Sequence, residues 1–212
     1  MSVSTIHNII FDLGGVILNI DPQLTVDAFH NLGWNNFYEA NNQSLNKELF
    51  YNLEQGSSSP EAFRENVRKM IDAQIDDQQI DTAWTAMILD IPADRVNYLV
   101  ELKKNYKLYL LSNTNEIHRI KFHHDFERDF GYSFYNLFEH NFYSHEMMMR
   151  KPDQQIYLKA MEEANLIPEE TLFIDDMEEN TVAANFTGMK VLHIQPGTLL
   201  QRLPDFLNDA HS

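Results

Sequence analysis

Short runs of apolar residues recur along the chain, and each run is followed by a stretch with helical spacing. Four of these runs predict β-strands, over residues 6–11, 107–111, 171–174 and 190–194. A weaker apolar and aromatic run over 134–143 predicts a short strand near the edge of a sheet. Because strands that alternate with helices form parallel sheets covered by helices, the pattern predicts the α/β class.

Two of the intervening stretches predict crossover helices that pack one apolar face against the sheet. The stretch after Pro152 and the stretch over 94–104 place the following apolar residues on a common helical face: Ile156, Tyr157, Ala160, Met161 and Ala164 in the first, and Val96, Leu99 and Val100 in the second.

The region from Pro22 to about Asp90 carries no strand pattern and predicts a helical insertion after the first strand. Within it, Ser59 is placed to cap a helix that begins at Pro60. Its small core is expected to come from aromatic side chains, namely Trp34, Phe37, Tyr38, Phe50, Tyr51 and Trp84. Basic residues of this region, Arg64, Arg68 and Lys69, are expected on a solvated helical face.

Composition limits the classes of partner. The chain has 212 residues, enough for one principal domain, and its 16 basic and 32 acidic side chains give a net charge of −16. That field repels nucleic acid and anionic membranes. No run approaches about 20 apolar residues, so we expect a cytoplasmic protein. We expect it to be a monomer or a homodimer. The absence of cysteine excludes disulfides and thiolate sites.

The residues that follow the predicted strands are polar in a way that suggests chemistry. Asp12 follows the first strand, Ser112 and Asn113 follow the second, and Asp175 with Asp176 follow the third. Ligands bind beyond the carboxyl ends of parallel strands, so one site could contain them all. Two adjacent carboxylates repel each other unless a cation lies near, and they therefore favour metal binding.

Each of these features also has an ordinary structural explanation. Asp and Gly residues are common where a strand enters a turn, which alone would explain Asp12. The segment over 112–115 has the composition of a helix N-cap, and Lys151, taken alone, would be a surface lysine.

Together the motifs resemble those of the haloacid dehalogenase-like hydrolase superfamily, in order and over roughly residues 6–195. The motifs are Asp12-Leu13-Gly14-Gly15-Val16, Leu111-Ser112-Asn113-Thr114, Arg150-Lys151-Pro152-Asp153 and Ile174-Asp175-Asp176-Met177-Glu178-Glu179-Asn180. The resemblance implies a three-layer, Rossmann-like parallel-sheet core, residues 1–18 and 91–212, with an α-helical cap domain, residues 19–90, inserted after the first strand. The detail around Asp12 is similar to a branch that includes glucose-1-phosphate phosphatases.

The resemblance also implies roles for the candidate residues. Asp12 would be the nucleophile that forms an aspartyl-phosphate. Mg²⁺ would be bound by Asp12, the backbone carbonyl of Gly14, Asp175 and Asp176, in keeping with its preference for oxygen. The Ser112 hydroxyl and the Asn113 amide would bind phosphate oxygens, while Lys151 would balance negative charge. Asn180 could orient Asp176 or Lys151. The substrate would be a small phosphorylated metabolite, such as a sugar phosphate.

The chain departs from the pattern of most phosphatases in this superfamily at Gly14. They carry a second Asp there, which serves as general acid and base, and losing such a group typically costs on the order of 10²- to 10⁴-fold in rate. Asp21 is a candidate substitute, although capping of the helix at Pro22 explains it at least as well. We therefore expect a preference for phosphates with good leaving groups. A second departure, Met147-Met148-Met149 before Arg150, is expected to pack beside the site.

Two other functions remain open at the level of sequence. A 2-haloacid dehalogenase would also use Asp12, but it needs no metal, and Asp175-Asp176 argues against it. A catalytically weak regulator that binds a phosphate ligand would gain nothing from a carboxylate placed beside a dianion. The histidines show no zinc-like spacing, and no nucleotide-binding loop is present.

Overall fold

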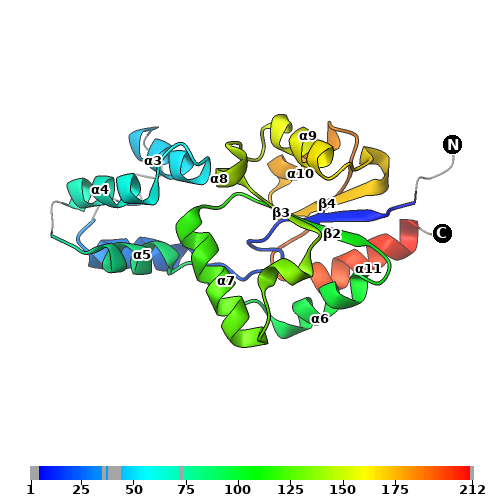
Figure 1. Ribbon diagram of the computed structural model, residues 1–212, viewed down its shortest axis with the longest axis horizontal. Helices are drawn as coiled ribbons and strands as arrows, with labels where there is room; N and C mark the ends of the chain where they lie inside the picture. Colours follow the sequence, from blue (N-terminus) through cyan, green and yellow to red (C-terminus); the bar gives the residue numbers. More distant parts are fainter. Residues whose placement is uncertain (1–4, 35–36, 38–43, 72–73, 211–212) are drawn as a thin grey trace.

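The protein forms an α/β core with a helical insertion at one end (Figure 1). The structure is a computed structural model that describes residues 5–34, 37, 44–71 and 74–210. Its parallel sheet has the strand order β3-β2-β1-β4-β5. The strands are β1 (Asn8–Phe11), β2 (Lys107–Ser112), β3 (His140–Tyr143), β4 (Thr171–Asp175) and β5 (Lys190–His193). β1 therefore lies at the centre, and its carboxyl end points toward the insertion.

Helices cover both faces of the sheet, which confirms the three-layer α/β fold. Helices α6 (Ala93–Leu102), α7 (Glu116–Phe130) and α11 (Leu199–Ala210) cover one face, and α9 (Gln154–Glu163) and α10 (Glu178–Asn185) cover the other (Figure 1). Along β1 the side chains alternate between these two layers, with Ile9 and Phe11 in one core cluster and Ile10 in the other. All three are fully buried, as expected for a parallel sheet covered on both faces.

Two expectations need correction. Val100 of α6 is 45% exposed, because the helix turns Val96 and Leu99 toward the sheet and leaves Val100 outside that face. In the segment 134–143 only the second half is a strand. The first half is the 3₁₀ helix η1 (Phe134–Leu137), whose start is capped by the Ser133 side chain accepting a hydrogen bond from Tyr135 N.

The insertion consists of helices packed around an aromatic cluster of their own. They are α1 (Pro22–Asn31), α3 (Ser44–Glu54), α4 (Pro60–Ile71) and α5 (Asp77–Thr85). Of the aromatic residues expected in its core, Trp34, Phe37, Phe50 and Trp84 are buried, and Tyr51 is partly exposed. Tyr38 lies outside the described residues. The domain boundaries 1–18, 19–90 and 91–212 remain a prediction.

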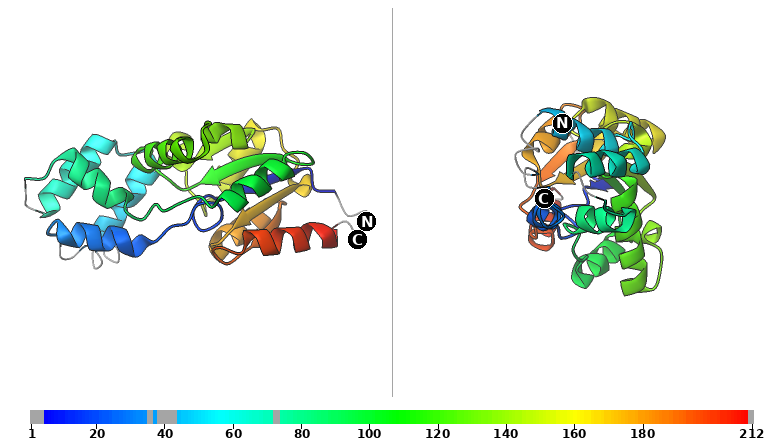
Figure 2. Two further views of the ribbon diagram at one scale, coloured as in Figure 1. Left: turned by 90° about the horizontal axis from the view of Figure 1, so that it is seen from below. Right: turned by 90° about the vertical axis from the view of Figure 1, so that its left-hand side faces the viewer.

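Two chain segments join the insertion to the core, and they run side by side. Asn19 N donates to Asp90 O at 2.9 Å, Leu89 N donates to Asn19 O at 3.0 Å, and Asp21 N donates to Met87 O at 2.9 Å. We call this paired stretch, residues 19–21 and 87–90, the hinge. Figure 2 shows the molecule extended along the line from the insertion through the hinge to the core.

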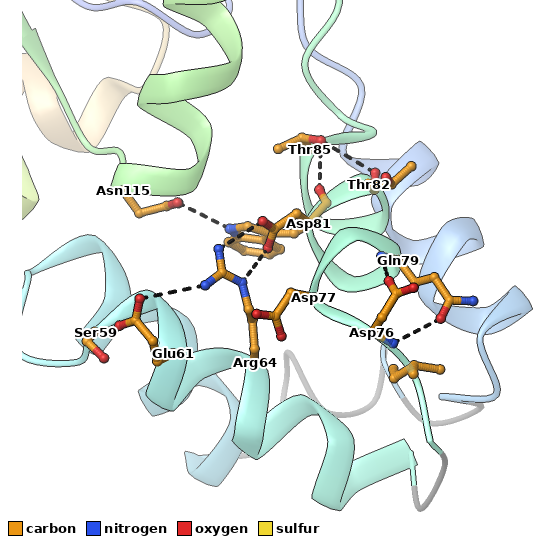
Figure 3. A network of polar contacts seen from close by, with 12 residues as sticks. Ser59, Glu61, Arg64, Asp76, Asp77, Gln79, Asp81, Thr82, Thr85 and Asn115 are labelled. Atoms are coloured by element: carbon orange, nitrogen blue, oxygen red, sulfur yellow. Dashed lines mark hydrogen bonds and ion pairs between the residues drawn. The ribbon is translucent and has the colours of Figure 1, made fainter.

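Two basic residues of the insertion, Arg64 and Arg68, pair with its own carboxylates, and Figure 3 shows the pairs of Arg64. Lys69 is exposed, as expected. The Arg64 guanidinium donates to both Asp81 oxygens at 2.8 Å, and Arg68 pairs with Asp77. These contacts tie α4 to α5, so Arg64 and Arg68 are paired within the insertion while they remain partly exposed. Among the described residues, no helix combines the length and the apolar character that crossing a bilayer requires.

Candidate active site

Three carboxylates meet at the carboxyl edge of the sheet. Asp12 follows β1, Asp175 ends β4 and Asp176 follows it, and each offers an oxygen within 4.8 Å of the others. Strands β1 and β4 are hydrogen-bonded neighbours, with Phe11 in register with Ile174, so the residues after them must lie together. Parallel pairing thus turns two distant sequence motifs into one cluster.

Lys151 is a buried residue that pairs with two of these carboxylates. Its Nζ lies 2.8 Å from Asp12 Oδ1 and 2.7 Å from Asp175 Oδ2, and its side chain is only 1% exposed. Burial lowers the pKa of the Lys151 ammonium, but Asp12 and Asp175 raise it by more, so that the net shift is upward. The alternative of a surface lysine is therefore wrong, and Lys151 is a charged partner of both carboxylates.

The backbone of Lys151 is fixed by the side chain of Asn113. Lys151 N donates to Asn113 Oδ1 at 2.8 Å, and Asn113 Nδ2 donates to Lys151 O at 2.9 Å. One amide side chain thus satisfies both polar groups of the Lys151 backbone and ties the end of β2 to the loop before α9. The resemblance implied only a backbone role for Asn113, because the spacing of residues does not reveal which side chain will reach a distant loop.

Asn180 orients Asp175 directly, not Asp176 or Lys151 as expected. Its Nδ2 lies 3.0 Å from Asp175 Oδ1 and 3.1 Å from Asp175 Oδ2. Met177 N adds a hydrogen bond to Asp175 Oδ1 at 2.8 Å. The carboxylate of Asp175 is completely buried, and its two oxygens are fully engaged by hydrogen bonds from Asn180, Met177 and Lys151.

The electrostatics of Asp12 fit a site that holds a cation. Its carboxylate is buried, and this desolvation raises its pKa, with the Asp175 charge adding to the rise and Lys151 opposing it. Desolvation also raises the pKa of Asp176, again helped by Asp175. One lysine thus faces three clustered carboxylates, and the remaining negative charge and the all-oxygen donor set suit a hard divalent cation such as Mg²⁺.

Two glycines shape the wall beside Asp12. A Cβ on Gly14 would lie 3.2 Å from Ile20 Cδ1, so the Ile20 side chain covers the place where a side chain at position 14 would begin. Gly15 has a φ of +75°, and a Cβ there would lie 2.4 Å from Asp176 Oδ2. Gly15 is thus required both by its backbone conformation and by the close approach of Asp176.

Asp21 stands apart from the carboxylate cluster in its contacts. It is exposed, and its Oδ1 accepts a hydrogen bond from Gln23 N at 3.0 Å as the N-cap of α1. The capping function that the sequence offered as an alternative is therefore present. A part for Asp21 in catalysis remains a prediction.

Residues after β2 combine the expected capping function with the predicted site. Ser112 is buried at the end of β2, and Asn115 caps α7 by accepting a hydrogen bond from His118 N at 3.1 Å. The Asn115 oxygen also faces the indole nitrogen of Trp84 at 3.3 Å, a contact that Figure 3 shows between α7 and the insertion.

The methionines before Lys151 differ in their exposure to solvent. Met147 is buried, whereas Met148 is 54% exposed.

Comparison with known proteins agrees with this geometry. The family model of haloacid dehalogenase-like hydrolases matches residues 6–185. A D-ribitol-5-phosphate phosphatase of Bacteroides thetaiotaomicron is 28% identical over 193 residues, which cover 91% of this chain and 93% of that protein. A sesquiterpene phosphatase of Aspergillus oryzae is 27% identical over 195 residues, 90% of this chain and 91% of that protein. The crystal structure of a HAD family enzyme of Bacteroides thetaiotaomicron, in complex with magnesium and inorganic phosphate, superimposes with a TM-score of 0.82 at 34% identity, covering 91% of this chain and 96% of that one.

Proposed function

The chain belongs to the haloacid dehalogenase-like hydrolase family, and from this premise we propose that it is a magnesium-dependent phosphatase that hydrolyses a small sugar phosphate through an aspartyl-phosphate intermediate. The observation that carries the proposal is the cluster of Asp12, Asp175 and Asp176, with Lys151 between two of its members. Phosphatase relatives that align over about nine-tenths of the chain support the reaction class. A small phosphorylated sugar or sugar alcohol as substrate is supported by one of those relatives.

In the proposed reaction Asp12 is the nucleophile. Its Oδ1 accepts from Lys151, which leaves the other carboxylate oxygen to attack phosphorus. The new bond joins that oxygen to phosphorus, the bond from phosphorus to the ester oxygen breaks, and the leaving alcohol requires a proton. Water then hydrolyses the aspartyl-phosphate, which releases inorganic phosphate and regenerates Asp12. Lys151 balances the charge of the phosphoryl group, and Ser112 with the Asn113 amide binds its oxygens.

The proposed Mg²⁺ ligands are Asp12, the Gly14 carbonyl and Asp176, with Asp175 as a further candidate. Asp175 already accepts hydrogen bonds from Lys151, Met177 and Asn180, so we assign it mainly to orienting Lys151. When bound, Mg²⁺ would neutralise charge between the carboxylates and the phosphoryl oxygens.

The proton for the leaving group is the open step of this proposal, because Gly14 carries no side chain. Asp21 is the protein group that we propose as donor, acting after a movement at the hinge that releases it from Gln23. The Asp21→Asn variant tests this assignment with an alkyl phosphate, whose departure depends on a proton. Hydrolysis at the wild-type rate would exclude Asp21 and leave the substrate or solvent as the source.

Hydrolysis of p-nitrophenyl phosphate, with and without Mg²⁺, tests the proposed function. This ester has a good leaving group and so tolerates a missing acid. We expect Mg²⁺-dependent release of nitrophenolate by the wild type and none by Asp12→Asn, which keeps the size of the side chain but is a far poorer nucleophile. Equal inertness of both proteins in Mg²⁺ contradicts the phosphatase proposal, and activity without metal on a 2-haloacid would favour the dehalogenase instead.

A panel of phosphate esters then separates the proposed substrate classes. In an anomeric sugar phosphate the sugar leaves from phosphorus with little help from an acid. The primary alcohol of a pentitol or hexose phosphate is a poorer leaving group and needs a proton. If kcat/KM is higher for the anomeric esters, the leaving group decides specificity. If pentitol 5-phosphates are preferred, contacts between the insertion and the polyol decide it, and the expectation of activated substrates is wrong.

A further inference from the structure

The nucleophile of the candidate active site and its two charged neighbours are largely buried. The side chain of Asp12 is 12% exposed, that of Lys151 is 1% exposed, and that of Asp175 is completely buried. Separation of the elements around Asp12 would therefore widen the access of a phosphate ester to it. The insertion is the mobile candidate, because only the two segments of the hinge connect it covalently to the core.

Away from the hinge, the insertion touches the core in two places: Trp84 of α5 contacts α7, and the end of α3 meets the segment that precedes Lys151. Figure 1 shows α3 beside α8 (Ser144–Met147). Arg150 Nη2 lies 2.9 Å from Glu54 Oε2, and the Arg150 guanidinium lies 3.8 Å from the centre of the Tyr51 ring. Arg150 is thus a core residue held by an ion pair and a cation–π contact from the insertion.

Backbone contacts extend the same interface. Ser144 Oγ lies 2.6 Å from Glu54 O, and Gln55 Nε2 donates to Met148 O at 3.4 Å. Gly56 has a φ of +73°, and a Cβ on it would lie 2.1 Å from His145 O, so only glycine permits this approach. We call the contacts of residues 51–56 with residues 144–150 the closing contact.

The ion pair in the closing contact is substantially desolvated. The side chains of Glu54 and Arg150 are each 24% exposed, and burial raises the pKa of Glu54 while Arg150 opposes the rise. A desolvated pair of this kind is strongly sensitive to the loss of one partner, because the other charge is left without compensation. Separation of the insertion from the core returns both groups to water, so the pair can form and break with the movement.

We infer that Glu54 and Tyr51 are positioning residues that hold Arg150, and that this contact fastens the insertion over the site while Lys151 engages Asp12. Arg150 and Lys151 are consecutive, so the segment that carries the catalytic lysine is held from the core by Asn113 and from the insertion by Glu54. Closure of the insertion is thereby linked to the same loop that supplies the charge at the nucleophile. The inference rests on the proposed phosphatase activity for its kinetic readout only.

The test compares Glu54→Gln with Asp81→Asn. Both variants replace a carboxylate that pairs with an arginine by its amide, but the Asp81 pair with Arg64 lies wholly within the insertion (Figure 3). We expect Glu54→Gln to lower kcat for p-nitrophenyl phosphate about tenfold, which corresponds to about 1.4 kcal/mol. Asp81→Asn should leave kcat unchanged. In Glu54→Gln, hydrogen exchange should rise in peptides over 48–57 and 144–150 and not elsewhere.

A second variant separates closure from general loss of packing. In Glu54→Leu/Arg150→Met both charges are removed together, and we expect this double variant to recover most of the kcat that Glu54→Leu alone loses, because no unpaired charge remains. The inference is overturned if Glu54→Gln and Asp81→Asn have the same kcat and the same hydrogen exchange over residues 48–57 and 144–150. If the wild type hydrolyses no phosphate ester, the proposed function fails, and the exchange measurement still decides whether the closing contact exists.

Discussion

Gly15 offers a sharp test of the proposed metal site, because any side chain there must displace Asp176. In Gly15→Ala the new Cβ would lie 2.4 Å from Asp176 Oδ2, and the backbone would keep a left-handed φ of +75°. Gly131 is a matched control, since its φ is +77° and a Cβ there meets nothing within 4 Å. The left-handed conformation costs an alanine about 1 kcal/mol at either position, or about 2–4 °C in Tm for a chain of this length.

The two variants should differ in metal dependence, since only Gly15→Ala moves a carboxylate of the cluster. We expect it to raise the Mg²⁺ concentration for half-maximal hydrolysis of p-nitrophenyl phosphate about 10- to 100-fold, a range typical of a disturbed metal environment. Gly131→Ala should have the same Mg²⁺ dependence of hydrolysis as the wild type. Like Gly15→Ala, it should have a lower Tm. Identical Mg²⁺ curves for the two variants, with Gly15→Ala folded, would refute the assignment of Asp176 to the metal site.

Three further predictions concern other parts of the molecule. Asn113→Ala removes both hydrogen bonds to the Lys151 backbone, so we expect the free energy of unfolding in urea to fall by about 2 kcal/mol and kcat to fall as well. In Gly14→Asp the new Cβ would lie 3.2 Å from Ile20 Cδ1, and the isoleucine must shift to accept it. Gly14→Asp with Ile20→Ala should therefore hydrolyse alkyl phosphates faster than Gly14→Asp alone, and equal rates would contradict this. Burial lowers the pKa of His118 from 6.5 to about 4. As pH falls from about 6.5 to 4, the unfolded state binds a proton that the folded state does not, so the free energy of unfolding falls by up to about 3 kcal/mol. His118→Gln should show a smaller loss in urea unfolding between pH 7 and pH 4.5.

The strands and the residues that follow them could be predicted from the sequence because both depend on local pattern. Continuous apolar runs identify strands buried on both faces, and the parallel arrangement then brings Asp12 and Asp175 to one edge without further information. The segment 134–143 shows the limit of this reasoning. Its aromatic residues suit a strand or a 3₁₀ turn equally, and the Ser133 cap decides for the turn over Phe134–Leu137.

Contacts between distant segments could not be predicted in the same way. Lys151 has the composition of a surface residue, and only the approach of Asp12 and Asp175 from two strands makes its burial favourable. The Asn113 side chain and the Glu54–Arg150 pair depend on loops that meet across the fold, at 38 and 96 residues of separation. Such separations carry no periodic signal, and the geometry that selects these partners exists only after the helices have packed.

The packing of Ile20 over Gly14 also constrains how this protein could change over evolutionary time. With Ile20 present, the Cβ of an acidic residue at position 14 would lie 3.2 Å from Ile20 Cδ1, so the isoleucine must shift to accept it. A smaller residue at position 20 meets no such obstacle and opens the space that a carboxyl group needs. The order of the two substitutions therefore matters, and a lineage that acquires an acid beside Asp12 is expected to lose the isoleucine first.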